Sequence, residues 1–79
     1  MLLHIYSLRK PVMRREVKSV NLKTVSGEIT VLDNHRPLIA FLGSGPIRIV
    51  DEKDKEETLE AQSGFLEVRP KGEVNILLD

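Results

Sequence analysis

Short apolar runs separated by turn residues recur along the whole chain. Val and Ile clearly outnumber Ala in these runs, and β-branched side chains favour the half-buried surface of a sheet over a helix. Short strands that recur with turn signals are typical of a sandwich or barrel. We therefore predict an all-β fold, a small antiparallel β-sandwich or flattened barrel of about eight to ten short strands. The clearest runs are residues 2–8, 17–24, 28–32, 38–42, 47–50, 58–61, 65–69 and 74–78.

The alternation of apolar positions changes phase at two places. Apolar residues occupy odd positions in the run 58–61 and even positions after Gly64, and a strand with a period of two cannot do both without an inserted residue. Gly64 is therefore expected to mark a bulge or corner. The same change of phase between Val17 and Val20 predicts a second irregularity near residues 18–19.

Residues 51–62 are mostly charged helix formers, with Leu59 and Ala61 as their apolar content. Two apolar residues bury too little surface to stabilise a helix. We expect a polar hairpin tip at residues 51–57, followed by an edge strand rich in Glu.

The inward-facing residues of two antiparallel sheets, about 10 Å apart, are expected to form one core. Both Phe residues lie in apolar runs, so they are expected in the core rather than at the surface. The predicted core residues are Ile5, Val20, Leu22, Ile29, Val31, Leu38, Phe41, Ile47, Ile49, Leu66, Val68, Val74 and Ile76.

The composition narrows the class of protein. A chain of 79 residues is one domain, which we expect to cover residues 1–79. Twelve basic and 12 acidic residues cancel, so there is no overall electrostatic reason to bind nucleic acid or an anionic membrane. The absence of Cys excludes disulfides, thiol catalysis and Cys-based zinc sites. No apolar run approaches the roughly 20 residues that span a bilayer, and we expect a soluble cytoplasmic domain.

The charges are nevertheless segregated along the chain. Six basic residues against Glu16 give residues 9–23 a local charge of +5, and six acids against two Lys give residues 51–60 a local charge of −4. Such patches favour an oriented contact with a partner or a neighbouring copy, but a solvated strand face and hairpin tip explain them equally well. The six basic residues are Arg9, Lys10, Arg14, Arg15, Lys18 and Lys23.

That basic N-terminal surface supports one hypothesis, a free-standing β-module that binds nucleic acid or another protein. Single-stranded nucleic acid stacks on aromatic side chains, and the chain has only Tyr6, Phe41 and Phe65. Because both Phe residues are expected in the core, we do not expect nucleic acid as a partner.

Two short motifs resemble catalytic or phosphate-binding features. The Gly43-Ser44-Gly45 segment is glycine-rich, but a phosphate loop opens a helix, whereas here Pro46 lacks an amide proton and a strand follows. Glu28, Asp33 and His35 are close in sequence, but no nucleophile pattern accompanies them, which favours solvated surface residues. We predict no catalytic residue, metal site, nucleotide site or cofactor.

Three segments in order carry a family resemblance: SGEITVLDNHRPL at 26–38, GPIRIV at 45–50 and SGFLEVRP at 63–70. Their order and spacing resemble the N-terminal β-sandwich domain of the epsilon subunit of rotary ATP synthases, from about residue 2 to residue 79. Thr30 stands where members of that family usually carry Gly, and Asp33 where they usually carry Pro.

The resemblance implies a non-catalytic rotor subunit of the central stalk, which couples ion-driven rotation to ATP synthesis. It implies a peripheral location on the cytoplasmic side of the energy-transducing membrane. Residue 79 is where the family's two-helix domain would begin, so we expect neither the regulatory brake nor the ATP site of that domain. The surface that those helices would cover is expected to allow the isolated chain to self-associate. By position, Glu28 matches a contact with the c-ring, whereas the matches to contacts with the gamma subunit are Ser7, His35, Arg36, Pro37, Leu38 and Ala40.

Overall fold

The structure is a computed structural model that describes residues 1–9 and 13–78. All its regular elements are strands, and each of the eight predicted runs forms one, which confirms the all-β prediction. Among the described residues there is no helix of the length and apolarity needed to cross a membrane. In chain order the strands are β1 (Leu2–Ser7), β2 (Met13–Thr24), β3 (Gly27–Leu32), β4 (Leu38–Phe41), β5 (Gly45–Asp51), β6 (Glu56–Ala61), β7 (Gly64–Arg69) and β8 (Glu73–Leu78).

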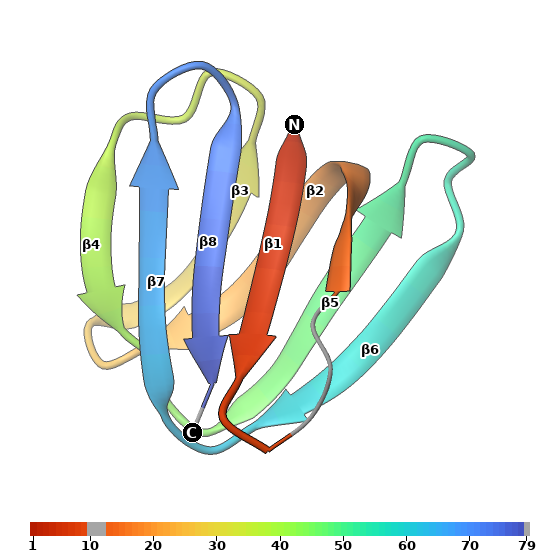
Figure 1. Cartoon of the computed structure of the whole chain (residues 1–79). Coiled ribbons are helices and arrows are strands. Elements are labelled where there is room, and N and C mark those ends of the chain that lie inside the picture. Colours follow the sequence, from red (N-terminus) through yellow and green to blue (C-terminus); the bar gives the residue numbers. More distant parts are fainter. Residues whose placement is uncertain (10–12, 79) are drawn as a thin grey trace.

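The strands form two layers that share β2 (Figure 1). Sheet A has the order β4-β7-β8-β1-β2, and sheet B has the order β3-β2-β5-β6. The first part of β2 pairs with β1 and the rest with β3 and β5; the β2–β5 register shifts between Val17 and Ser19. This shift is the predicted irregularity near residues 18–19, and it lies where β2 passes from one layer to the other.

One strand pair differs from the antiparallel prediction. β1 and β8 run parallel, from Leu2 beside Glu73 to Ser7 beside Leu78. These two strands come from opposite ends of the chain, so no short hairpin forces them to run in opposite directions. β1 lies between β8 and β2, which places both ends of the sequence in the middle of sheet A.

Gly64 lies at the other predicted irregularity. It begins β7, which belongs to sheet A, directly after β6, which belongs to sheet B. Its φ of +152° is rarely adopted by other residues, and a Cβ added there would lie 2.1 Å from the carbonyl oxygen of Leu77. Gly64 therefore marks a corner between the sheets, as predicted.

The charged segment forms the β5–β6 hairpin, with its tip between residues 51 and 56. The Asp51 carboxylate accepts hydrogen bonds from the backbone N–H groups of Lys53 and Lys55. These bonds hold the pKa of Asp51 below its usual value. β6 lies at the edge of sheet B with Glu56 and Glu60 exposed, as predicted.

Most of the predicted core residues are buried, but the expectation that both Phe residues lie in the core was wrong. The Phe41 side chain is 59% exposed, and Phe65 is 43% exposed. In β4 the inward positions are occupied by Leu38 and Ala40, which turns the alternate positions outward. Ile29 and Leu38 are half-buried against the core, and buried core residues that the sequence did not predict include Met1, Leu3, Val17, Leu42 and Ala61.

Candidate functional site

The predicted contact residues lie at opposite ends of β3. Glu28 is its second residue, beside the turn that follows Thr24, and His35 lies in the turn after Leu32. Glu28 and Leu32 are four residues apart in sequence, about 13 Å along an extended strand. The turns occupy opposite ends of the molecule (Figure 1). A carboxylate and an imidazole so far apart do not form an acid–base pair.

Glu28 is exposed on the outer face of sheet B. The side-chain nitrogen of Asn21, in the neighbouring β2, donates hydrogen bonds to Glu28 Oε2 at 3.0 Å and to Thr30 Oγ1 at 2.8 Å. Asn21 pairs directly with Thr30 across the strands, and Glu28 lies diagonally to it. The sequence reasoning missed this bond because the register between β2 and β3 is needed to see it.

His35 forms hydrogen bonds within its own turn. Its backbone N–H donates to the Leu32 carbonyl at 3.1 Å, and the preceding Asn34 has a φ of +67°. The His35 Nδ1 atom lies 2.8 Å from the Arg36 carbonyl oxygen. Because a carbonyl only accepts, Nδ1 carries the proton in this bond, and in the neutral ring Nε2 is then an acceptor for a partner.

The other predicted contact residues do not form one surface. Arg36 and Pro37 are exposed in the turn, whereas Leu38 and Ala40 are half-buried on the inward side of β4. Ser7 ends β1, and its Oγ accepts the N–H of Arg9 at 3.2 Å. Cross-strand pairing aligns Leu38 with Leu3 of β1 through β7 and β8, so Ser7 lies four residues, about 13 Å, beyond that row.

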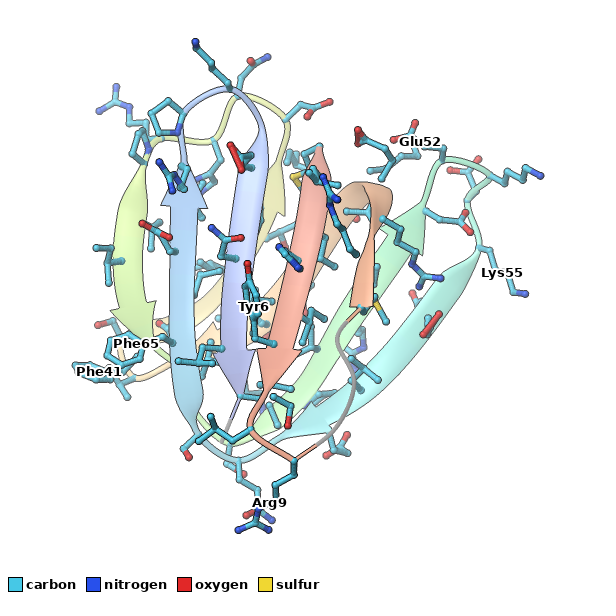
Figure 2. The ribbon with its side chains drawn as sticks, in the orientation of Figure 1. Tyr6, Arg9, Phe41, Glu52, Lys55 and Phe65 are labelled. Atoms are coloured by element: carbon cyan, nitrogen blue, oxygen red, sulfur yellow. The ribbon has the colours of Figure 1, made fainter. Side chains whose placement is uncertain are left out.

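An exposed apolar row crosses sheet A on its outer face. Phe41, Phe65, Leu77 and Tyr6 are successive cross-strand neighbours on β4, β7, β8 and β1. The two Phe rings are in contact, with centroids 4.7 Å apart (Figure 2). Ile39 lies on the same face and is 71% exposed. We call these five residues the apolar sheet face; the run 38–42 is apolar throughout, so nothing in the sequence indicated that Ile39 and Phe41 face outward.

Polar groups border the apolar sheet face. The Tyr6 hydroxyl and His4 Nδ1 share a hydrogen bond of 2.7 Å, and Asn75 donates to Glu67 Oε1 at 3.2 Å. The first bond joins two residues of β1 and the second joins β8 to β7, and both restrain polar side chains beside the apolar row. The face is therefore an ordered apolar surface with a polar border, which is the usual composition of a protein–protein contact.

The two oppositely charged segments face one another within the chain. Arg15 pairs with Glu57 at 2.5 Å, and Lys18 pairs with Asp54. The Asp54 hydrogen bond and charge raise the pKa of Lys18. Part of the charge that was expected to attract a partner is thus neutralised within the chain. Lys10, another of the six basic residues, lies outside the described residues.

The family described as "ATP synthase, Delta/Epsilon chain, beta-sandwich domain" matches residues 1–79. The ATP synthase epsilon chain of Chromohalobacter salexigens is 35% identical over 75 residues, which are 95% of this chain and 52% of that protein. The epsilon chain of Shouchella clausii is 44% identical over 55 residues, 70% of this chain and 41% of that protein. The chain therefore spans about half the length of the curated relatives it matches.

Two solved structures share the fold. One is the Euglena gracilis mitochondrial ATP synthase, OSCP/F1/c-ring, with a TM-score of 0.91, 23% identity, and coverage of 99% of this chain and 49% of the matched chain. The other is the Tetrahymena thermophila mitochondrial ATP synthase, central stalk and c-ring, with a TM-score of 0.81, 14% identity, and coverage of 99% and 62%. On the match over its whole length, this chain belongs to the β-sandwich domain family of the ATP synthase delta and epsilon chains.

Proposed function

We propose that this chain is the β-sandwich part of a non-catalytic central-stalk subunit of a rotary ATP synthase. It attaches to the gamma subunit and the c-ring, turns with the rotor and couples ion-driven rotation to ATP synthesis. It reaches the cytoplasmic side of the energy-transducing membrane only through this complex. Membership of the delta/epsilon family and the epsilon-chain relatives support the proposal.

The observation that carries the proposal is the apolar sheet face. Four large side chains lie in one row on four paired strands, so the backbone that carries them is already ordered before a partner binds. Aromatic side chains are the usual energetic centres of protein–protein contacts. The Arg36–Pro37 turn leads directly into Ile39 and Phe41, so the face continues into the predicted gamma contact.

The geometry favours binding over chemistry. Glu28 and His35, the candidate acid and base, lie at opposite ends of β3. Within residues 1–9 and 13–78, neither Glu28 Oε1 nor His35 Nε2 takes part in a hydrogen bond, which suits a hydrogen bond to a partner. Glu28 is the proposed c-ring contact, and the turn at His35 is part of the proposed gamma contact. The exposure of Phe41 and Phe65 removes the sequence-based argument against nucleic acid, but Arg15 and Lys18 are paired within the chain, which leaves less basic charge for that hypothesis.

Size-exclusion chromatography with light scattering tests the proposal. The chain is mixed with the gamma subunit of its host at low and moderate salt, and we expect a one-to-one complex in both. Phe65→Ser should weaken the complex, whereas Val25→Ser, at a side chain 70% exposed in the β2–β3 turn, should not. Separate elution of the wild-type chain and gamma in both salts would contradict the stalk role.

A further inference from the structure

We propose that Asn21 is the positioning residue for Glu28. It holds the Glu28 carboxylate over the outer face of sheet B, in the orientation that the c-ring contact uses. This inference rests on the proposed function, since the c-ring contact of Glu28 is part of it. It adds a residue on a different strand, β2, through which that contact is organised.

The amide of Asn21 has a fixed orientation. Its nitrogen has two protons, and the two hydrogen bonds to Glu28 Oε2 and Thr30 Oγ1 use both. A carboxylate without a proton only accepts, so the nitrogen and not the oxygen of the amide must face Glu28. Asn21 lies in the strand between β3 and β5, where backbone pairing on both sides holds it in place.

Lys23 is the residue that the strand register would favour as the partner of Glu28, because the two are direct cross-strand neighbours. None of the ion pairs found within residues 1–9 and 13–78 joins them. The Lys23 side chain instead runs toward β5, where a Cβ added to Gly45 would lie 2.9 Å from Lys23 Cδ. Asn21, and not Lys23, is therefore the side chain that holds Glu28 in the described part of the chain.

Holding the carboxylate has a consequence for binding. An exposed Glu side chain samples many rotamers, and ordering it on binding costs free energy. The bond to Asn21 uses Glu28 Oε2, and Oε1 accepts no hydrogen bond within the described part of the chain. Oε1 is left to accept from a donor or cation of the partner. Thr30 gives Asn21 its second anchor.

Affinity for two probes tests the inference: the host gamma subunit alone, and gamma attached to the purified c-ring in detergent. Asn21→Ala and Glu28→Gln should each leave affinity for gamma unchanged and weaken the second complex roughly three- to tenfold. Combining them should cost no more than Glu28→Gln alone, because Asn21 acts through Glu28. Lys18→Ala is the matched control, since Lys18 also lies in β2 and bonds a carboxylate, that of Asp54 in the β5–β6 hairpin, but makes no bond to Glu28 within the described residues.

Asn21→Asp separates positioning from packing. Asp has nearly the shape of Asn, so a packing role predicts a milder effect than Asn21→Ala. The proposal predicts a larger loss of affinity, because a second carboxylate would then face Glu28. Side-chain couplings of Glu28 measured by NMR on the chain alone should show one dominant rotamer, and averaging in Asn21→Ala.

The possible results separate the two levels of the proposal. If Glu28→Gln weakens c-ring binding and Asn21→Ala does not, then Glu28 contacts the c-ring but Asn21 does not position it. If Glu28 already averages its rotamers in the wild-type chain, positioning is wrong whatever the partner. If the wild-type chain binds gamma with the c-ring no more tightly than gamma alone, both the proposed c-ring contact and the positioning role of Asn21 are wrong. If it binds neither probe, the proposed stalk role is wrong.

Discussion

The ammonium nitrogen of Met1 lies 3.2 Å from Oδ1 of Asp33. It also donates to the Val17 carbonyl at 3.0 Å and lies 3.5 Å from Oε2 of Glu16. Burial lowers the pKa of this ammonium, but the hydrogen bond and charge of Asp33, together with Glu16, raise it above the usual value of 8.0. Asp33 thus ties the turn after β3 to the start of β1.

We expect this contact to make stability depend on pH on the alkaline side. A group with a folded-state pKa above its unfolded value stabilises the fold fully below the unfolded pKa, here 8.0, and loses that effect as the pH rises through the folded pKa. Asp33→Asn should lower the Tm by a few degrees at about pH 7, and the difference should shrink by about pH 9.5.

Asp54→Asn is the control for that measurement. It removes the partner of Lys18, which has a pKa raised above 10.5 and keeps its charge throughout the range. Its effect on the Tm should therefore be the same at about pH 7 and about pH 9.5. An Asp33→Asn difference equally constant with pH would mean that Asp33 acts through the turn and not through the ammonium.

Ile49→Ala should destabilise the fold by about 2–5 kcal/mol, because the removed atoms leave a cavity in the core. Ile49 is 0% exposed in β5, and a domain of this size has only about 5–15 kcal/mol of stability in total. Ile39→Ala, at a side chain 71% exposed, should change stability by less than about 0.5 kcal/mol. Urea unfolding of both variants measures this; equal effects would contradict the inward register of β5.

The strands were predictable because alternation and turn residues are local signals. Ile47 and Ile49 alternate with Arg48, which fixes the inward face of β5 from sequence alone. The run 38–42 is apolar at every position, so its pattern does not indicate which of its residues point toward the core. The pairing of β4 with β7 at the sheet edge fixes which side chains of β4 point inward, and Phe41 points outward. The apolar sheet face could not be predicted for this reason.

The electrostatic contacts depend on residues far apart in sequence. Lys18 and Asp54 are 36 positions apart, and they meet because β2 and β5 are paired. Charge counting found both segments but could not show that they neutralise one another. The bond from Asn21 to Glu28 likewise needs the β2–β3 register, which a one-residue slip would abolish. The family resemblance identified the candidate site residues, but the residues that hold them in place could be identified only from the structure.

Asp51→Ala should loosen the tip of the β5–β6 hairpin, because it removes the acceptor of two backbone bonds. We expect faster hydrogen exchange at the Lys53 and Lys55 amides and little change in the core of sheet A. Since the pKa of Asp51 is lowered, its contribution is present above the unfolded value of 3.8 and is lost as the pH falls through the folded pKa. Asp51→Asn keeps a carbonyl acceptor and should show slower exchange than Asp51→Ala, with no acid transition; equal exchange in both would contradict a capping role.

Gly64→Ala should destabilise the corner between the sheets by more than about 1 kcal/mol. The added Cβ would meet the Leu77 carbonyl oxygen at 2.1 Å, so β7 must move away from β8 or the corner must open. Gly27→Ala is the matched control, since Gly27 also has a positive φ, +130°, but no atom lies within 4 Å of its added Cβ. It should show only the cost of the backbone conformation. The Tm of Gly64→Ala should therefore be the lower of the two; equal values would mean that the close approach to Leu77 relaxes without cost.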